Sequence, residues 1–353
     1  MRIVVLGLSI TSSWGNGHAT NFRGLVQALD ARGHDVLFLE RDVPWYADNR
    51  DLPHPPYGRT FLYGSLDELR STYGSRVADA DLVVVGSYVP DGIEVGTWVQ
   101  ATACGLKAFY DIDTPVTLAA LERGDCAYLS RELVPGYDLY LSFTGGPTLQ
   151  RIEQQYGSPR ARAFYCLVDP AAYLPADVDR TWDLGYLGTW SADRQPKVDA
   201  LLVAPARHRP QARFVVAGPQ YPDDIAWPHN VERIDHLPPA EHPGFYNAQR
   251  LTLNVTRADM VTAGWSPSVR LFEAAACGVP VVSDWWEGLE AFFQPGKEIL
   301  VARTPEEVLE HMANTDDERR AELGAAARAR VLADHTSEHR AIELEEHVMV
   351  GAR

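Results

Sequence analysis

The stretch TAGWSPSVRLFEAAACGVPVVSDWWEG, residues 262–288, has the order loop, helix, tight turn and buried strand. Ser266 before Pro267 predicts the helix start, because serine caps helices and proline is favoured at the first helical position. Gly278 permits a tight turn after the helix. The apolar run VPVV that follows is typical of a strand buried on both faces, as in a parallel α/β sheet.

The same alternation extends in both directions from this unit. Before residue 168, strands are predicted at RIVVLGL (2–8), DVLFLE (35–40), DLVVVG (81–86), KAFYDI (107–112), LYLSF (139–143) and AFYCLV (163–168). After residue 180, they are predicted at WDLGYLG (182–188), RFVVAG (213–218), VERIDHL (231–237), LTLNVT (251–256), VPVVSD (279–284) and EILVA (298–302). Strands that alternate with helices predict parallel sheets covered on both faces.

The segment VDPAAYLPADVDR interrupts this alternation with two prolines, several acids and no helical period. We therefore expect residues 169–180 to link two Rossmann-like α/β domains, residues 1–168 and 181–330. A chain of 353 residues suits two domains of ordinary size. Ligands of such domains bind at the carboxyl ends of the strands.

The composition narrows the class of protein. Hydrophobic residues make up 46% and charged residues 23%, which indicates a globular chain. A net charge of -16 argues against a nucleic-acid partner. The cysteines are spaced too far apart for a metal knuckle or a redox pair: Cys104, Cys126, Cys166 and Cys277. No apolar run approaches the roughly 20 residues that span a bilayer, so we expect no transmembrane segment and a reduced, cytoplasmic protein.

The predicted helix start offers a site for an anion. Backbone N–H groups of Ser268, Val269 and Arg270 would lack intrahelical partners at the positive end of the helix dipole. Arg270 and Glu273 are three residues apart and share one helix face. An arginine beside a phosphate and a carboxylate beside sugar hydroxyls are compatible with a bound sugar nucleotide. The alternative is an ordinary intrahelical ion pair.

The segment SPSVRLFEAAACGVPVVSDWWEGLEAFFQPGKEIL resembles the donor-binding segment of GT-B glycosyltransferases. It is most similar to the spore-maturation-type (CgeB-like) glycosyltransferases with the group 1 C-terminal domain. GNGHATNFRGLVQALDARGHDVLFLERD, DIDTPVTL and LSFTGG resemble the same group. The resemblance implies a GT-B fold, in which two parallel sheets face across a cleft. It also implies an N-terminal acceptor domain, a C-terminal donor domain, and a helix at residues 331–353 that packs back on the N-terminal domain.

Residue by residue, the resemblance assigns roles in the donor domain. Glu273 matches the glutamate that binds the nucleotide ribose, and Gly278 and Pro280 match the turn after its helix. The wider retaining families carry another glutamate eight residues earlier, where this chain has Trp265. The two-glutamate motif is therefore incomplete.

Two further donor-side segments follow predicted strands. In GYLGTWSADRQPK, Gly188 ends the strand, and Arg194 and Lys197 resemble the family's basic pair that neutralises the donor pyrophosphate. The alternative is two surface cations beside acids. In this fold the RIDHLPP loop passes the base, so His236 and Leu237 are candidates for backbone contacts to it. The alternative is an ordinary strand-to-helix turn.

The loop SSWGNGH is the candidate acceptor-side segment. Gly15 and Gly17 permit close approach of a ligand, and Trp14 offers a ring on which a sugar can stack. His18 is a candidate general base, since histidine can take a proton near neutral pH. It loosely resembles the early histidine of inverting GT-B enzymes. A loop histidine without a catalytic role is the alternative.

Asp111 and Asp113, at the end of a predicted strand, are the rival candidates for the base. Two close carboxylates are also compatible with a metal site. The GT-B resemblance implies catalysis without a bound metal, so we expect neither a metal nor another cofactor. Fixed cations and the helix start would stabilise the charge of the leaving nucleoside diphosphate.

The prediction is a transferase that moves a sugar from a nucleotide-diphosphate donor to an acceptor hydroxyl or amine. A sugar-nucleotide epimerase or hydrolase of the same fold is one alternative, with Asp111 or Asp113 abstracting a proton. A non-catalytic sugar-nucleotide-binding or spore-surface protein is another, which Trp265 favours. The base, the sugar, the acceptor and the stereochemical outcome stay open at this point.

Overall fold

Two separate parallel sheets organise the computed structural model, which describes residues 1–351. The first unit comprises Met1–Leu167 together with the C-terminal helix α14 (Ser337–Gly351), and the second unit comprises Val168–Thr336. The predicted α/β class with two parallel sheets is confirmed. No helix within the described residues has the length and apolar character that crossing a bilayer requires.

The first sheet has the strand order β3-β2-β1-β4-β5-β6-β7, and all its pairings are parallel. Its strands are β1 (Arg2–Gly7), β2 (Asp35–Arg41), β3 (Arg59–Tyr63), β4 (Leu82–Gly86), β5 (Leu106–Asp111), β6 (Leu139–Ser142) and β7 (Ala161–Ala163). The helices between them are α1 (His18–Ala31), α2 (Pro44–Ala47), α3 (Leu66–Ala78), α4 (Gly92–Thr102), α5 (Thr114–Arg123), η1 (Val134–Gly136) and α6 (Pro147–Tyr156). Every residue of β4 is buried, as expected for a central parallel strand with helices on both faces.

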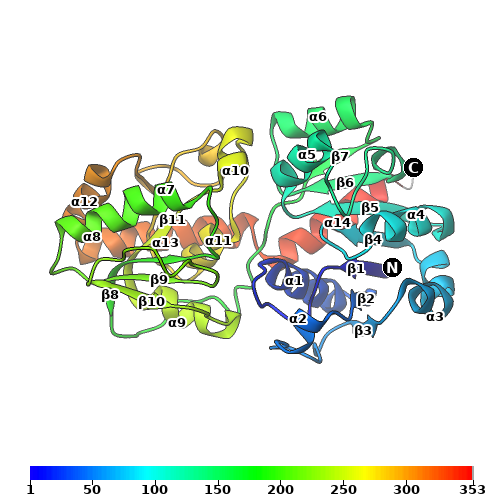
Figure 1. Ribbon diagram of the computed structural model, residues 1–353, viewed down its shortest axis with the longest axis horizontal. Helices are drawn as coiled ribbons and strands as arrows, with labels where there is room; N and C mark the ends of the chain where they lie inside the picture. The colour runs from blue at the N-terminus through cyan, green and yellow to red at the C-terminus, as the bar shows by residue number, and fades with distance from the viewer. Residues whose placement is uncertain (352–353) are drawn as a thin grey trace. The chain divides into compact units, whose positions relative to one another are not determined.

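Helix α14 packs on α1 within the first unit (Figure 1). The carboxylate of Glu345 accepts hydrogen bonds from Arg32 at 2.7 Å and contacts His34 at 2.7 Å. The Arg32 and His34 interactions outweigh burial and lower the pKa of Glu345 to about 2. The C-terminal helix is thus held to the end of α1 by charge.

The second sheet has the order β10-β9-β8-β11-β12-β13, again with parallel pairings. Its strands are β8 (Trp182–Leu187), β9 (Phe214–Ala217), β10 (Val231–Ile234), β11 (Gln249–Asn254), β12 (Val281–Ser283) and β13 (Leu300–Val301). The helical elements are α7 (Gln195–Val198), the π-helix η2 (Asp199–Val203), α8 (Ala204–His208), η3 (Pro239–Glu241), α9 (His242–Asn247), α10 (Ala258–Ala263), α11 (Val269–Ala276), η4 (Leu289–Ala291), α12 (Pro305–Asn314) and α13 (Asp317–Asp334).

In both sheets, the order in which the chain adds strands reverses at one point. In the first sheet the chain moves outward through β2 and β3 and returns to the other side of β1 at β4. In the second sheet β11 likewise lies beside β8, on the side away from β9. Ligands of such sheets bind outside the carboxyl ends of the strands at this switch point. A ligand site is therefore expected at the carboxyl ends of β1 and β4 and of β8 and β11.

Several boundaries differ from those expected. Tyr173, in the segment expected to be a linker, is 3% exposed and packs within the second unit. Helix α13 continues to Asp334 and packs on α11, so the returning helix begins at Ser337 rather than at residue 331. The predicted strand at residues 163–168 is wrong after Ala163. Phe164, Cys166 and Leu167 are buried outside the sheet, and Val168 forms an isolated bridge to Thr336, which periodicity alone does not reveal.

Candidate functional site

The side chain of Arg270 bridges the two strands at the switch point of the second sheet. Its Nε donates to the backbone oxygen of Leu187, the last residue of β8. Its Nη1 donates to Oδ1 of Asn254, the last residue of β11, at 2.7 Å. The guanidinium also lies 4.8 Å from the ring centroid of Tyr186. The Arg270 side chain therefore points to the strand ends. The alternative expected from the sequence, an intrahelical ion pair between Arg270 and Glu273, is wrong.

Gly188 brings the backbone close to this arginine. A Cβ at position 188 would lie 2.6 Å from the Tyr186 hydroxyl and 2.9 Å from Nη2 of Arg270. The Tyr221 hydroxyl donates to the Gly188 oxygen at 3.2 Å. Gly218, at φ +139°, completes the approach, since a Cβ there would lie 2.1 Å from the Gly188 oxygen. Only glycine fits at position 188 without displacing these groups.

Helix α11 starts two residues later than predicted. Ser268, with φ -83° and ψ 151°, is the N-cap residue, whereas Ser266 is buried in the preceding loop. The Ser268 hydroxyl donates to Oδ1 of Asn254 at 2.7 Å instead of capping the helix. The N–H groups of Val269 and Arg270 lie in the first turn, where an α-helix provides no internal acceptor. This helix start keeps the features of an anion site.

The two expected phosphate-binding cations lie in different surroundings. Lys197 Nζ lies 2.5 Å from Oδ2 of Asp284, which follows β12. Arg194 instead donates to the hydroxyl of Ser191 at 2.9 Å and to the backbone oxygen of Thr189 at 2.6 Å. Lys197 thus reaches the carboxyl edge of the sheet, whereas Arg194 stabilises its own loop.

Asp284 was missed in the sequence, although its place directly after VPVVS was a usable signal. Its Oδ1 accepts hydrogen bonds from the backbone N–H of Thr256 at 3.1 Å and from the Thr256 hydroxyl at 2.8 Å. Burial raises the pKa of Asp284 even though Lys197 and Thr256 lower it. The aspartate therefore holds Lys197 in place at the cost of a buried charge.

Glu273 is buried, and both of its carboxylate oxygens already have partners. Oε1 accepts from the Tyr173 hydroxyl at 3.0 Å, and Oε2 accepts from the Tyr246 hydroxyl at 2.9 Å. Nδ1 of His242 lies 3.8 Å from Oε2. Burial alone would raise the pKa of Glu273, but His242 and the tyrosine hydroxyls outweigh burial and lower it. Glu273 is thus an ionised carboxylate inside a small polar cluster.

The partners of Glu273 were not predicted. Tyr246 and His242 lie on α9, in the short sequence HPGFYN, and Tyr173 lies in the segment taken as a linker. None of these segments carries a chemical motif. The predicted base-contacting residues lie nearby in sequence: His236 is exposed, and the Leu237 oxygen lies 3.1 Å from Nε2 of His242.

In the first unit, a buried carboxylate shapes the loop between β1 and α1. Glu40 accepts from the hydroxyls of Ser9 at 3.1 Å and Thr11 at 2.6 Å. It also accepts from the backbone N–H groups of Ile10 at 2.7 Å and Thr11 at 3.0 Å. Four hydrogen bonds satisfy the buried charge. They also determine the path of the chain as it leaves β1.

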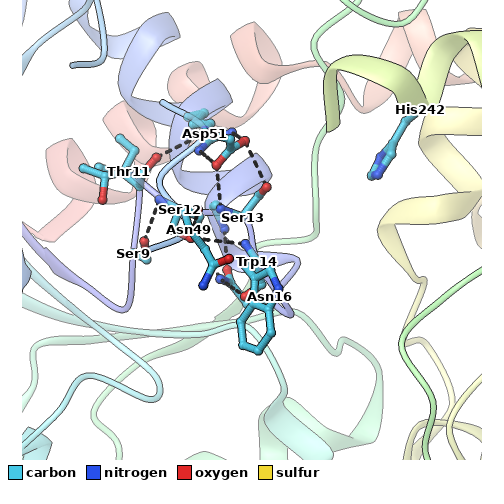
Figure 2. Close-up of polar contacts among 12 residues, drawn as sticks. Ser9, Thr11, Ser12, Ser13, Trp14, Asn16, Asn49, Asp51 and His242 are labelled. Carbon is cyan, nitrogen blue, oxygen red and sulfur yellow. Dashed lines mark hydrogen bonds and ion pairs between the residues drawn. The ribbon is translucent and has the colours of Figure 1, made fainter. Parts of the chain in front are cut away.

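The next part of this loop is held by hydrogen bonds to the carboxylate of Asp51, as Figure 2 shows for Ser13. Ser13 donates to Asp51 through both its N–H and its hydroxyl at 2.9 Å, and Arg23 binds the same carboxylate in bidentate form at 2.8 and 2.9 Å. Asn16 Oδ1 accepts from the N–H of Ala19 at 3.1 Å and so satisfies the first turn of α1. The loop that precedes His18 is thus held from several sides.

The small and aromatic residues of this loop differ in role. Gly15 has φ +67°, a left-handed conformation that favours glycine. A Cβ at Gly17 would meet no atom within 4 Å, so the fold itself does not require glycine there. The backbone N–H of Trp14 donates to the Ser12 hydroxyl at 3.3 Å. Trp14 is partly buried.

His18, the first residue of α1, faces Asp113 and Tyr88. Its Nε2 lies 4.0 Å from Oδ2 of Asp113, and its ring meets the Tyr88 ring edge-on with centroids 5.3 Å apart. The His18 side chain is 9% exposed. Tyr88 follows β4 with φ +62°, a strained conformation for a bulky residue. Residues from three strand ends therefore meet at this edge of the first sheet.

Asp111, unlike Asp113, does not lie beside His18. It is fully buried and accepts hydrogen bonds from the Tyr140 hydroxyl at 2.5 Å and the Thr117 hydroxyl at 2.7 Å. Burial raises its pKa to about 6. A carboxylate with no surface exposed to solvent cannot reach an acceptor. Of the two aspartates proposed as bases, only Asp113 lies at the candidate site.

Comparisons with known proteins agree with this architecture. Residues 194–346 match the glycosyl transferase-like family. No curated protein matches the sequence significantly. The sucrose-phosphate synthase of Thermosynechococcus elongatus is 15% identical, with a TM-score of 0.71 and 100% of both chains covered.

Two further solved structures are similar over 99% of both chains. Anabaena HepE in complex with UDP and glucose is 15% identical with a TM-score of 0.73. An alpha-glucosyltransferase in complex with UDP-glucose and DNA containing an abasic site is 13% identical with a TM-score of 0.73. The chain therefore has the fold of the GT-B glycosyltransferases, and its residues 194–346 match the glycosyl transferase-like family.

Proposed function

We propose that the protein is a glycosyltransferase that moves a sugar from a nucleoside-diphosphate donor to an acceptor hydroxyl or amine. The observation that carries this proposal is Arg270, held across the ends of β8 and β11 beside the start of α11. Gly188 and Lys197 lie at the same edge of the sheet. Cations, a close glycine backbone and a helix start are what a diphosphate requires.

The diphosphate gains charge as the bond to the anomeric carbon breaks. Fixed positive groups stabilise that charge more in the transition state than in the ground state. Arg270, Lys197 and the first turn of α11 would perform this role, which supports catalysis without a metal. HepE and the alpha-glucosyltransferase were solved with UDP or UDP-glucose, so UDP-glucose is the first donor to test.

Glu273 would hold the ribose of the donor. A carboxylate offers about four acceptor positions, of which Tyr173 and Tyr246 use two. The low pKa of Glu273 keeps it an acceptor at neutral pH. The SPSVRLFEAAACGVPVV segment around it also supports membership of the spore-maturation-type branch.

On the acceptor side, His18 would act as the general base. It would take the proton from the acceptor oxygen as that oxygen attacks the anomeric carbon and the nucleoside diphosphate leaves. Asp113, 4.0 Å from Nε2, would stabilise the resulting imidazolium. In a retaining reaction the departing phosphate can take that proton, and His18 would only shape the acceptor site.

A thermal-shift screen against UDP-, GDP-, dTDP- and CDP-sugars tests the donor site, because a bound ligand raises the unfolding temperature. Product analysis with the stabilising donor then tests the reaction. A new glycoside supports the proposal. An isomerised donor or free sugar would indicate an epimerase or hydrolase, and binding without turnover would indicate a non-catalytic protein. The absence of any shift would contradict a donor site.

A further inference from the structure

A fully buried side chain at the end of β11, Asn254, uses its whole hydrogen-bonding capacity. Its Oδ1 accepts from the Ser268 hydroxyl and from Nη1 of Arg270, each at 2.7 Å. Its Nδ2 donates to the Ser283 hydroxyl at 2.9 Å and to the Thr256 hydroxyl at 3.2 Å. An asparagine offers two donors and two acceptor positions, and all four are occupied.

The chemistry of its partners allows only one orientation of this amide. The Ser283 hydroxyl donates its proton to the Asp284 backbone oxygen at 2.9 Å, and the Thr256 hydroxyl donates to Oδ1 of Asp284 at 2.8 Å. Both hydroxyls must therefore accept from Asn254. An arginine only donates, so an amide turned by 180° would place donors against donors on one side.

The same chain of hydrogen bonds reaches the second cation. Asp284 is held by the N–H and hydroxyl of Thr256, and its Oδ2 binds Lys197 at 2.5 Å. A continuous path thus runs from Arg270 through Asn254, Thr256 and Asp284 to Lys197. It crosses the ends of neighbouring strands β11 and β12.

We infer that Asn254 is a positioning residue that holds Arg270 and, through Thr256 and Asp284, Lys197 as one cationic unit for the donor diphosphate. The inference rests on the proposed function. Two like charges near one ligand repel each other, and long side chains lose conformational entropy when they bind. The shared buried network offsets the repulsion between the cations and restricts both side chains before the donor binds. Asn254 acts through the cations and touches no substrate.

The variant Asn254→Asp tests this role. Its carboxylate would neutralise Arg270 and could not donate to Thr256 or Ser283. Calorimetry should show the affinity for UDP reduced by about tenfold or more, a loss typical of a charged hydrogen bond. The affinity for uridine, which lacks the diphosphate, should stay within about twofold.

Asn230→Asp is the matched control. The Asn230 amide donates to the backbone oxygens of Ala206, Arg209 and Ala212 at 3.1, 3.0 and 2.9 Å, and the residue precedes β10 at the opposite edge of the sheet. Its substitution should leave both affinities unchanged. An equal loss of UDP and uridine binding in Asn254→Asp would indicate a merely structural role and would overturn the inference.

Thr256→Val gives a second route if Asn254→Asp fails to fold. It keeps the shape of the side chain but removes the hydroxyl between Asn254 and Asp284. In the wild-type background Lys197→Ala should weaken UDP binding about tenfold, and in the Thr256→Val background by about threefold or less. Equal effects in both backgrounds would overturn the coupling. A wild-type protein that does not bind UDP at all contradicts the proposed donor and this inference together.

Discussion

The Nε2 atom of His18 lies 4.0 Å from Oδ2 of Asp113, although 94 residues separate them in the chain. His18 starts the helix after β1, and Asp113 follows β5. Both side chains are largely buried yet keep some access to solvent. A histidine beside a carboxylate is suited to take a proton, because the carboxylate stabilises the charge that forms.

Removal of the imidazole in His18→Ala should lower kcat by roughly 10²–10⁴-fold, the range for general base catalysis. Asp113→Asn should lower kcat less, since it removes only the stabilising charge. Initial rates with UDP-glucose and an accepted alcohol measure both effects, and UDP affinity should not change. The exposed His54 in the same unit supplies the control His54→Ala. Near-normal turnover of His18→Ala would point to a retaining, substrate-assisted reaction.

Glu273→Ala should weaken the fold as well as donor binding. Loss of the carboxylate leaves the buried Tyr246 hydroxyl without its acceptor and leaves the Tyr173 hydroxyl with its longer contact to Nδ1 of His242 at 3.3 Å. An unsatisfied buried group costs about 1–3 kcal/mol, which urea denaturation can measure. Glu310→Ala, at an exposed position, should change the free energy of unfolding by less than about 0.5 kcal/mol.

Glu273→Gln separates donor binding from folding. Glutamine keeps the shape and one acceptor but loses the charge, so the affinity for UDP should fall while the fold is better preserved. Unchanged UDP affinity by calorimetry in the folded Gln variant would remove Glu273 from the donor site.

Turnover should survive chelation by EDTA. Under the proposed function, Arg270, Lys197 and the start of α11 supply the positive charge that a metal ion provides in metal-dependent transferases. Rates before and after EDTA treatment, with magnesium or manganese added back, measure this. Activity that disappears with EDTA and returns with either metal is the contrary result.

The loop before His18 should lose stability in acid. Burial raises the pKa of Asp51, but the hydrogen bonds from Arg23 and Ser13 outweigh burial and lower it to about 2 from an ordinary 3.8. A folded pKa below the unfolded value stabilises the fold above about pH 4, and this contribution disappears as the pH falls towards 2. Asp51→Asn should therefore be less stable than wild type at pH 7 and equally stable near pH 2. Denaturation over a pH series tests this, and a difference independent of pH would refute it.

The sequence by itself determined the α/β class, most strands of both sheets and the helix that carries Arg270 and Glu273. These features depend on local patterns: buried strands read as apolar runs, and helices show a period of 3.6 residues. It also supplied Asp113 as a candidate from its place after a strand and Arg270 from the predicted helix start. His18 and Lys197 came from their positions in loops and from the family resemblance.

Only the tertiary structure decided which of these groups meet. Asp111 and Asp113 are two residues apart, yet one is sealed beneath Tyr140 and the other faces His18. Tyr173 reaches Glu273 across 100 positions, and Asn254 links two cations that lie on different helices. Such contacts depend on the order of the strands in the sheet and on the fact that buried polar groups need hydrogen-bond partners. Neither the strand order nor the choice of partner can be recognised from a short stretch of sequence.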